Sequence, residues 1–274
     1  MTIAAGFAHK DGVLLCADTE EQKGAMKGHR PKIVEFDWKG SAGAFAFAGN
    51  SDFALATIQK CKTRLESTST KDALAVIEDV LDKEYTRLVF KHPSYPEDYG
   101  LPFWLLAVIP RVVKSEAMGD VGIVELYKSN EHSLQKVQHF AAIGIGDTFA
   151  RHIIGPSFIG SLSERRILCL AAYMLKLAKE NVPGCSGASQ IISLRHDGSI
   201  GRFYTDPLIE HLEEWAFPFA VISQSLFFRH VMEDRPLETF DDALHAFTVQ
   251  ARHMRDSWLN KPRPMAITDL SPRD

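Results

Sequence analysis

Residues 2–18, TIAAGFAHKDGVLLCAD, follow Met1, and this stretch decides the fold. It holds two short apolar runs separated by a polar turn that ends in Asp11-Gly12, and the second run stops at Asp18. An Asp-Gly pair between apolar runs is a common turn signal between neighbouring strands. We therefore predict that two strands begin the fold and that the N-terminus is part of it.

Composition excludes several classes of protein. The 274 residues are 45% hydrophobic and 24% charged, which is enough apolar material for a sizeable core and rules out a mainly disordered chain. The net charge is -4 with histidine neutral, so no basic surplus is available to neutralise phosphates. We therefore expect no nucleic-acid partner.

The location of the protein is inferred from three further features. No run of 18 apolar residues occurs, so we expect no membrane span. The first seven residues lack the basic start and the cleavage pattern of a signal peptide. The four cysteines form no CxxC pair, and in a long chain without a secretion signal they are expected to be reduced. We predict a cytoplasmic protein.

Strand-like and helix-like stretches follow each other along the chain. Short apolar runs and period-two alternation predict strands, whereas apolar residues at spacings of three and four predict amphipathic helices. The predicted strands are 32–36, 42–48, 103–109, 122–127, 137–143 and 189–194, the predicted helices are 51–65, 70–90 and 163–179, and 19–31 is predicted to be a polar, solvated loop. This order favours the α+β class, with a sheet core and helices outside.

No linker or internal repeat divides the chain. We predict a core over residues 1–205 and a helical C-terminal extension over 206–274 that packs on this core as part of the same domain. The extension is rich in aromatic residues. Packing on the core is the simpler explanation for its aromatic faces, and contact within an oligomer is the alternative.

The sharpest chemical signal is Thr2. Its small side chain permits removal of Met1, which would place a hydroxyl nucleophile and a free α-amine on one residue. An α-amine has a pKa of roughly 7.7–8.0, which suits proton transfer near neutral pH. Small residues follow Met1 in many proteins, so this position needs support from elsewhere in the chain.

Asp18, Lys32 and Gly49 give that support. A buried ammonium beside the threonine hydroxyl would ease formation of an alkoxide, and a carboxylate beside the ammonium would hold it charged and oriented. Gly49 follows a strand of small residues and would let a substrate approach its backbone N–H, which is a donor suited to an oxyanion. Each of these residues taken singly also fits an ordinary strand-end charge or turn glycine.

Together these residues resemble the N-terminal part of proteasome β-type subunits and of their bacterial relatives, the HslV-type and Anbu-type peptidases. The segments that carry the resemblance are Thr2-Ile3, 11–18, Lys32-Ile33 and 48–52, with looser matches at the glycine turns 144–146 and 186–188. The resemblance spans about residues 2 to 200. It implies the four-layer αββα sandwich of N-terminal nucleophile hydrolases.

The resemblance also implies roles for particular residues. Thr2 would be the nucleophile, Lys32 its electrostatic activator and Asp18 the partner of that lysine. Gly49 would donate to the oxyanion, and Ser186 matches an outer residue of the family's site. The implied activity is that of a threonine-type endopeptidase that forms an acyl-enzyme on Thr2. The implied partners are peptide or unfolded protein substrates, further copies of the chain in a proteasome-like homo-oligomer, and an AAA+ unfoldase.

Several positions depart from the family pattern. Ile145 stands where a serine is usual, Pro183 where an acidic residue is usual, and Glu20 where a basic residue is usual. Ile3 stands where many members have a second threonine. The Gly-Ile-Gly-Asp pattern at 144–147 is nearer to the Anbu type. These losses leave two alternatives open, namely a non-catalytic structural subunit and an amidase that acts on a small amide.

Other nucleophiles and metal sites have less support. Cys16 and Cys185 stand in apolar or glycine-rich settings without a histidine nearby in sequence, which fits small core thiols. The 11 histidines show no metal-binding spacing, so we expect neither a metal nor a cofactor. Phe47, two residues before Gly49, is expected to shape the substrate pocket for a modest or apolar side chain.

Overall fold

The computed structural model describes residues 2–23, 26–67, 72–91, 103–115, 119–130, 132–155, 162–203, 209–210, 212–214 and 237–260. The chain divides into two compact units, Met1–Asp206 and Pro207–Asp274. In the second unit, helix α6 spans Leu237–Asn260. The packing of residues 206–274 on the core stays a prediction.

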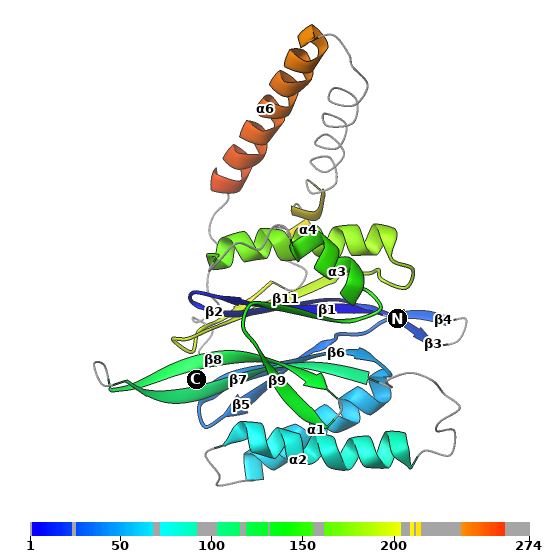
Figure 1. Ribbon diagram of the computed structural model, residues 1–274, viewed down its shortest axis with the longest axis vertical. Helices are drawn as coiled ribbons and strands as arrows, with labels where there is room; N and C mark the ends of the chain where they lie inside the picture. The colour runs from blue at the N-terminus through cyan, green and yellow to red at the C-terminus, as the bar shows by residue number, and fades with distance from the viewer. Residues whose placement is uncertain are drawn as a thin grey trace, which may run out of the picture. The chain divides into compact units, whose positions relative to one another are not determined.

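Two antiparallel five-stranded sheets form the centre of the first unit (Figure 1). The first sheet has the order β10-β1-β2-β11-β12, from β1 (Ile3–His9), β2 (Gly12–Asp18), β10 (Phe140–Gly144), β11 (Ser189–Arg195) and β12 (Ile200–Arg202). The second sheet has the order β5-β6-β7-β8-β9, from β5 (Ile33–Trp38), β6 (Ser41–Gly49), β7 (Phe103–Ser115), β8 (Gly119–Asn130) and β9 (Ser133–Val137). The two strands predicted at the start of the chain are β1 and β2, and they pair.

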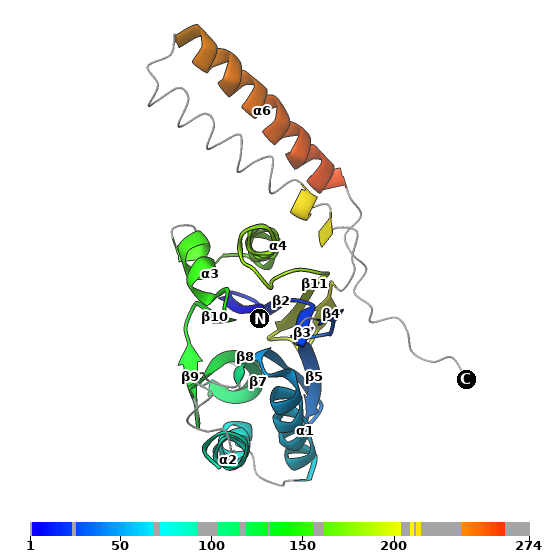
Figure 2. The same cartoon turned by 90° about the vertical axis from the view of Figure 1, so that its right-hand side faces the viewer.

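Helices cover the outer faces of both sheets. Helices α3 (Asp147–Ile154) and α4 (Glu164–Asn181) lie over the first sheet (Figure 1). Helices α1 (Ser51–Ser67) and α2 (Ala73–Tyr85) lie over the second, and a π-helical turn, Thr86–Phe90, continues α2. Figure 2, turned by 90°, shows the same succession of helices, sheet, sheet and helices. The predicted α+β class, with helices outside a sheet core, is confirmed, and both sheets are antiparallel.

Strand β6 shows how the sequence builds these layers. Its alanines at 44, 46 and 48 belong to the core between the two sheets, whereas Phe45 and Phe47 pack in the core beneath α1 and α2. Side chains alternate between the two faces of a strand. The face with the small residues therefore packs on the other sheet, and the face with the large residues packs on the helices. Small side chains on the inner face allow the two sheets to approach closely.

Two element predictions are wrong. Residues 20–23 and 26–29 are not loop, because Glu20–Lys23 (β3) pairs with Met26–His29 (β4). Strand β4 is exposed, as predicted for a polar segment, but Thr19 and Glu20 are buried. The run 137–143 is not one strand, since β9 ends at Val137 and β10 begins at Phe140 in the other sheet. The errors have different causes. Strands β3 and β4 carry no apolar alternation that would mark them as strands, and the apolar run 137–143 does not reveal that its two ends pair in different sheets.

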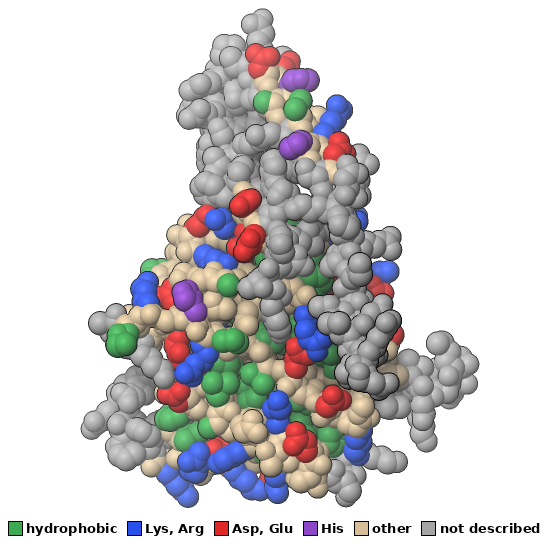
Figure 3. Space-filling model, turned by 180° about the vertical axis from the view of Figure 1, so that it is seen from behind, with side chains coloured by type: hydrophobic (Ala, Val, Ile, Leu, Met, Phe, Trp, Pro, Cys, Tyr) green, Lys and Arg blue, Asp and Glu red, His purple; other side chains and the backbone are tan. Residues whose placement is uncertain are grey.

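The surface of the first unit carries charges of both signs. On the face in Figure 3, acidic and basic side chains are interspersed over the first unit, with Lys and Arg gathered at its lower end, where α1 and α2 lie. Among the described residues, no helix has the length and apolar character to cross a bilayer. None of the four cysteines forms a disulfide bond. Cys16 and Cys185 are buried, as predicted for core thiols.

A cluster on β7, β8 and β9 gives a testable dependence of stability on pH. Burial by itself would raise the pKa of Glu125, but hydrogen bonds from Lys136, Tyr127 and Arg111 outweigh burial and lower the pKa to about 2. A carboxylate with a lowered pKa stabilises the fold above its ordinary value of 4.5 and loses that contribution as the pH falls toward 2. We expect the wild type to be more stable than Glu125→Gln at neutral pH, and the difference to shrink below pH 4.5. Urea unfolding at a series of pH values measures it, and a difference that is constant with pH would contradict it.

Candidate active site

Thr2 lies immediately before β1 and is buried, with an exposed fraction of 4%. Its carbonyl oxygen accepts a hydrogen bond from the Gly146 amide at 3.4 Å. The amide of the next residue, Ile3, donates to Asp18 Oδ1 at 3.1 Å. Because β1 pairs with β10 on one side and with β2 on the other, the start of the chain is held from both sides.

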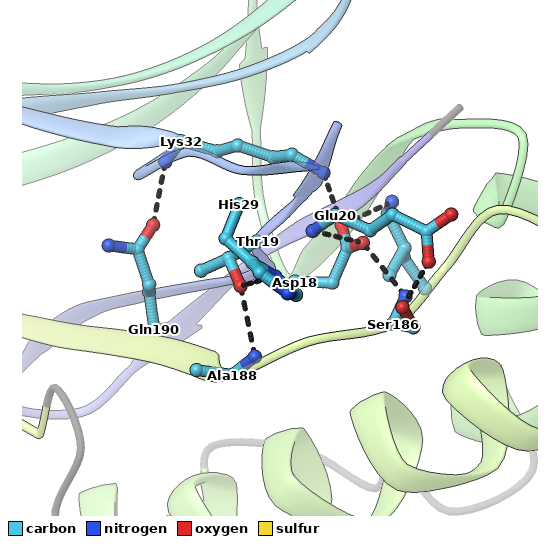
Figure 4. Close-up of polar contacts among 9 residues, drawn as sticks. Asp18, Thr19, Glu20, His29, Lys32, Ser186, Ala188 and Gln190 are labelled. Atoms are coloured by element: carbon cyan, nitrogen blue, oxygen red, sulfur yellow. Dashed lines mark hydrogen bonds and ion pairs between the residues drawn. The ribbon is translucent and has the colours of Figure 1, made fainter. Parts of the chain in front are cut away.

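Asp18, at the end of β2, is fully buried and accepts four hydrogen bonds (Figure 4). The donors are the Ile3 amide to Oδ1 at 3.1 Å, Lys32 Nζ to Oδ1 at 2.8 Å, and the Glu20 and Ser186 amides to Oδ2 at 3.2 Å each. Burial raises the pKa of Asp18, and the charge of Lys32 opposes that shift. Four donors satisfy a carboxylate that would otherwise be costly to bury.

Lys32 lies just before β5 and joins the two sheets at this end of the fold. Its amide donates to Gln190 Oε1 at 2.6 Å, and its carbonyl accepts from the Phe47 amide at 3.1 Å. The side chain is 4% exposed, and its Nζ forms an ion pair with Asp18 Oδ1. Burial lowers the pKa of the Lys32 ammonium, and Asp18 opposes that shift. Lys32 is therefore a fixed cation whose pKa is lower than that of a lysine in water.

A cavity of about 240 Å³ opens beside this ion pair. We call it the Thr2 cavity, and its lining residues are Thr2, Glu20, Glu21, Gln22, Arg30, Lys32, Phe47, Gly49, Asn50, Ser51 and Asp52. Three of the five predicted site residues, Thr2, Lys32 and Gly49, therefore face one space. Phe47 lines it too, but most of the other walls are polar, which is at odds with the expected preference for an apolar side chain.

Gly49 is the last residue of β6 and has a φ of +93°, a conformation that side chains other than glycine rarely adopt. The Phe47 amide points to the β5 side, where it donates to the Lys32 carbonyl. Amides two residues apart in a strand point the same way, so we expect the Gly49 N–H to point past the start of β5, and Gly49 lines the Thr2 cavity. Next in the chain, Asn50 Oδ1 accepts from the amides of Asp52 and Phe53 and caps α1.

Ser186 lies in the turn before β11 and contacts two carboxylates. Its amide donates to Asp18 Oδ2 at 3.2 Å, and its hydroxyl donates to Glu20 Oε2 (Figure 4). The Glu20 amide returns a hydrogen bond to the Ser186 carbonyl at 3.0 Å. Sequence reasoning placed Ser186 in the site but treated Glu20 only as a lost basic residue. The absence of an acidic residue at Pro183 was the available signal to look for another acid near Ser186.

Comparison with solved structures identifies the fold. Anbu, an ancestral β-subunit from Yersinia bercovieri, superposes with a TM-score of 0.64 at 12% identity, over 81% of this chain and 96% of that one. An Anbu (Gly-1) mutant from Hyphomicrobium sp. strain MC1 gives 0.63 at 13% identity, over 82% and 96%. The chain has the fold of Anbu. A helical assembly of the Anbu complex from Pseudomonas aeruginosa also matches, with a TM-score of 0.63 at 12% identity over 85% and 97%.

The likeness to Anbu concerns the fold alone, because the identities are so low. No protein-family model matches the chain, and no curated protein matches it in sequence. The predicted likeness to the Anbu type is thus confirmed at the level of architecture. The roles of the five site residues stay predictions.

Two other features of the site bear on its chemistry. Ile145, in the turn that holds the Thr2 carbonyl within this Anbu fold, is 51% exposed and supplies no polar side chain there. Cys185, one residue before Ser186, is buried, and burial raises the pKa of its thiol to about 12. A thiol with that pKa is not a nucleophile at neutral pH. Within the described residues, no three His, Cys, Asp or Glu side chains are placed to hold a metal ion.

Proposed function

We propose that the chain is a threonine-type endopeptidase of the N-terminal nucleophile hydrolase class, with Thr2 as its first residue after removal of Met1. One observation carries the proposal: Thr2 lines the same cavity as Lys32, whose ammonium is held at 2.8 Å by the buried Asp18. A buried cation fixed by a buried anion beside a hydroxyl is an arrangement that activates a nucleophile. The layered fold, read as a four-layer αββα sandwich, supports the same class.

The residues of the site divide the reaction between them. Thr2 Oγ1 attacks the carbonyl carbon of the scissile peptide bond, and its proton passes to the α-amine of Thr2. Lys32 stabilises the oxygen as it loses that proton, and the Gly49 N–H donates to the oxyanion of the tetrahedral intermediate. The C–N bond then breaks and the leaving amine takes the proton, which leaves an ester on Thr2. Water, deprotonated by the same α-amine, hydrolyses the ester and restores the hydroxyl.

The assembly and the partners are part of the same proposal. The Anbu complex from Pseudomonas aeruginosa is described as a helical assembly, and we extend self-assembly to this chain. A homo-oligomer would enclose the Thr2 cavities and admit only peptides or unfolded segments. An AAA+ unfoldase that feeds them and a cytoplasmic location fit this role.

The direct test is Thr2→Ala. We expect the wild type to have lost Met1 by intact mass, to form one adduct per chain with a threonine-directed epoxyketone, and to cleave fluorogenic peptides. Thr2→Ala removes the nucleophile, so cleavage is expected to fall at least about a thousandfold. Thr2→Ser is the matched control, because it keeps a hydroxyl and is expected to react with the epoxyketone.

Each other outcome favours a different function. Full peptidase activity in Thr2→Ala would contradict the proposal. Assembly without any adduct on Thr2 would favour the non-catalytic structural subunit, in line with the loss of polar residues at Ile145 and Pro183. Turnover of a small amide without peptide cleavage would favour the amidase.

A further inference from the structure

Glu20 places a buried negative charge in the wall of the Thr2 cavity. The side chain is 2% exposed, and both Glu20 and Thr2 line the cavity. The hydrogen bond from Ser186 is the main cause that lowers the pKa of Glu20, so the carboxylate is ionised at neutral pH. Burying a charge is costly unless it is compensated, and a charge kept beside a reacting group therefore calls for an explanation.

Attachment of the β3–β4 hairpin does not supply that explanation, because hydrogen bonds that do not involve the Glu20 side chain already hold this segment. The Arg30 amide donates to the Thr19 carbonyl at 2.8 Å, and the Glu20 amide donates to the Ser186 carbonyl at 3.0 Å. The Ala188 amide donates to Thr19 Oγ1 at 2.9 Å (Figure 4). None of these bonds depends on the charge of Glu20.

The charge of Glu20 is also less completely balanced than that of its neighbour. Asp18 is paired at 2.8 Å with Lys32, and both of these side chains are buried. Among the described residues, the cation that pairs directly with Glu20 is Lys27, at 3.3 Å, and its side chain is 69% exposed. An exposed ammonium is solvated and screened by salt, so it offsets a buried carboxylate only in part. Lys32 also attracts the Glu20 carboxylate, but its direct partner is Asp18. The other charged residues of the cavity pair with each other, Arg30 with Glu21 at 3.1 Å and with Asp52 at 3.2 Å. Part of the charge of Glu20 therefore stays uncompensated in the wall of the Thr2 cavity.

We propose that Glu20, held by Ser186, is a positioning residue that stabilises the ammonium formed when the Thr2 amine takes up the hydroxyl proton. This inference rests on the proposed function. During attack the amine becomes a second cation in the cavity that Lys32 already lines, and the two cations repel each other. Asp18 is occupied by Lys32, so Glu20 supplies the anion that compensates the new charge. Interactions that strengthen as charge develops lower the barrier of the reaction.

Glu20→Gln is the variant that isolates the charge. A glutamine keeps the length of the side chain and an oxygen that accepts from the Ser186 hydroxyl, but it removes the negative charge. The pKa of the Thr2 amine is measured by competitive labelling with acetic anhydride over a range of pH, read from the mass of the N-terminal peptide. We expect this pKa to fall by about half a unit or more in Glu20→Gln, because an anion near an amine favours its protonated form. We expect kcat/KM for a fluorogenic peptide to fall about 10- to 100-fold, with the acidic limb of its pH profile moved to lower pH.

Two further variants support the test. Ser186→Ala frees the Glu20 carboxylate, so a shift in the same direction is expected, and the double variant is expected to show little more than Glu20→Gln, since the two residues act as a unit. Glu84→Gln is the matched control. Glu84 is a similarly buried glutamate that pairs with Lys60 and Arg87 at the α1–α2 layer, and its replacement should leave the amine pKa unchanged.

The outcomes separate this inference from the proposed function. An amine pKa equal in wild type, Glu20→Gln and Ser186→Ala overturns the role of Glu20, whether or not the protein cleaves peptides. An N-terminal peptide that still carries Met1 overturns the proposed function, and this inference falls with it. Ser186→Ala gives the answer if Glu20→Gln does not fold.

Discussion

Lys32→Met is expected to destabilise the protein more than removal of both charges of the buried pair. The single variant leaves the Asp18 carboxylate fully buried with only amide donors, from Ile3, Glu20 and Ser186. Breaking a buried ion pair from one side typically costs about 3–5 kcal/mol, because the remaining charge is uncompensated. Adding Asp18→Asn removes that charge and is expected to restore part of the lost free energy of unfolding.

Activity is expected to behave differently from stability. Neither Lys32→Met nor the double variant keeps a cation beside the Thr2 hydroxyl, so both are expected to react with the epoxyketone at least about a hundredfold more slowly than the wild type. Denaturant unfolding and the labelling rate, measured on the same samples, separate the two effects. A double variant no more stable than Lys32→Met would show that the uncompensated charge is not the cause. Labelling of the double variant at the wild-type rate would remove Lys32 from the mechanism.

The first two strands and the candidate ion pair were predictable from sequence for local reasons. The runs around Asp11-Gly12 are apolar and bounded by a turn signal, and β1 and β2 form there. Asp18 and Lys32 stand at strand ends in a spacing that resembles a known family, and the structure joins them at 2.8 Å. In each case the information lies within a few tens of neighbouring residues.

The contacts that the sequence did not predict join residues far apart in the chain or involve buried residues that are polar. Ser186 and Glu20 are 166 residues apart, and only the pairing of β11 with β2 brings the turn before β11 to the end of β2. The β3–β4 hairpin shows no alternation of apolar and polar residues. Its buried residue Glu20 is polar and is held by a hydrogen bond from Ser186, so apolar periodicity does not predict its burial. The position interpreted as a lost basic residue therefore holds the carboxylate that accepts from the Ser186 hydroxyl.

Gly144→Ala is expected to impair both folding and the site through a single methyl group. Gly144 has a φ of +88°, and a Cβ built on it would lie 2.2 Å from the Thr2 carbonyl oxygen and 3.0 Å from Ala48 Cβ. The first contact is with backbone, so the start of the chain must move. Backbone strain costs about 1–2 kcal/mol and overpacking about 1–3 kcal/mol, so a loss of more than about 2 kcal/mol in the free energy of unfolding is expected.

Gly198→Ala is the matched control for this change. Gly198 has a φ of +83° in the β11–β12 turn, but a Cβ there would meet no atom within 4 Å. It therefore carries the backbone strain without the clash, and we expect it to lose about 1–2 kcal/mol and to keep the labelling rate of Thr2. Gly144→Ala is expected to label about a hundredfold more slowly, because displacing a nucleophile by even an ångström has an effect of that size. Equal labelling of the two variants would mean that the contact of the 144–146 turn with the Thr2 carbonyl does not position the nucleophile.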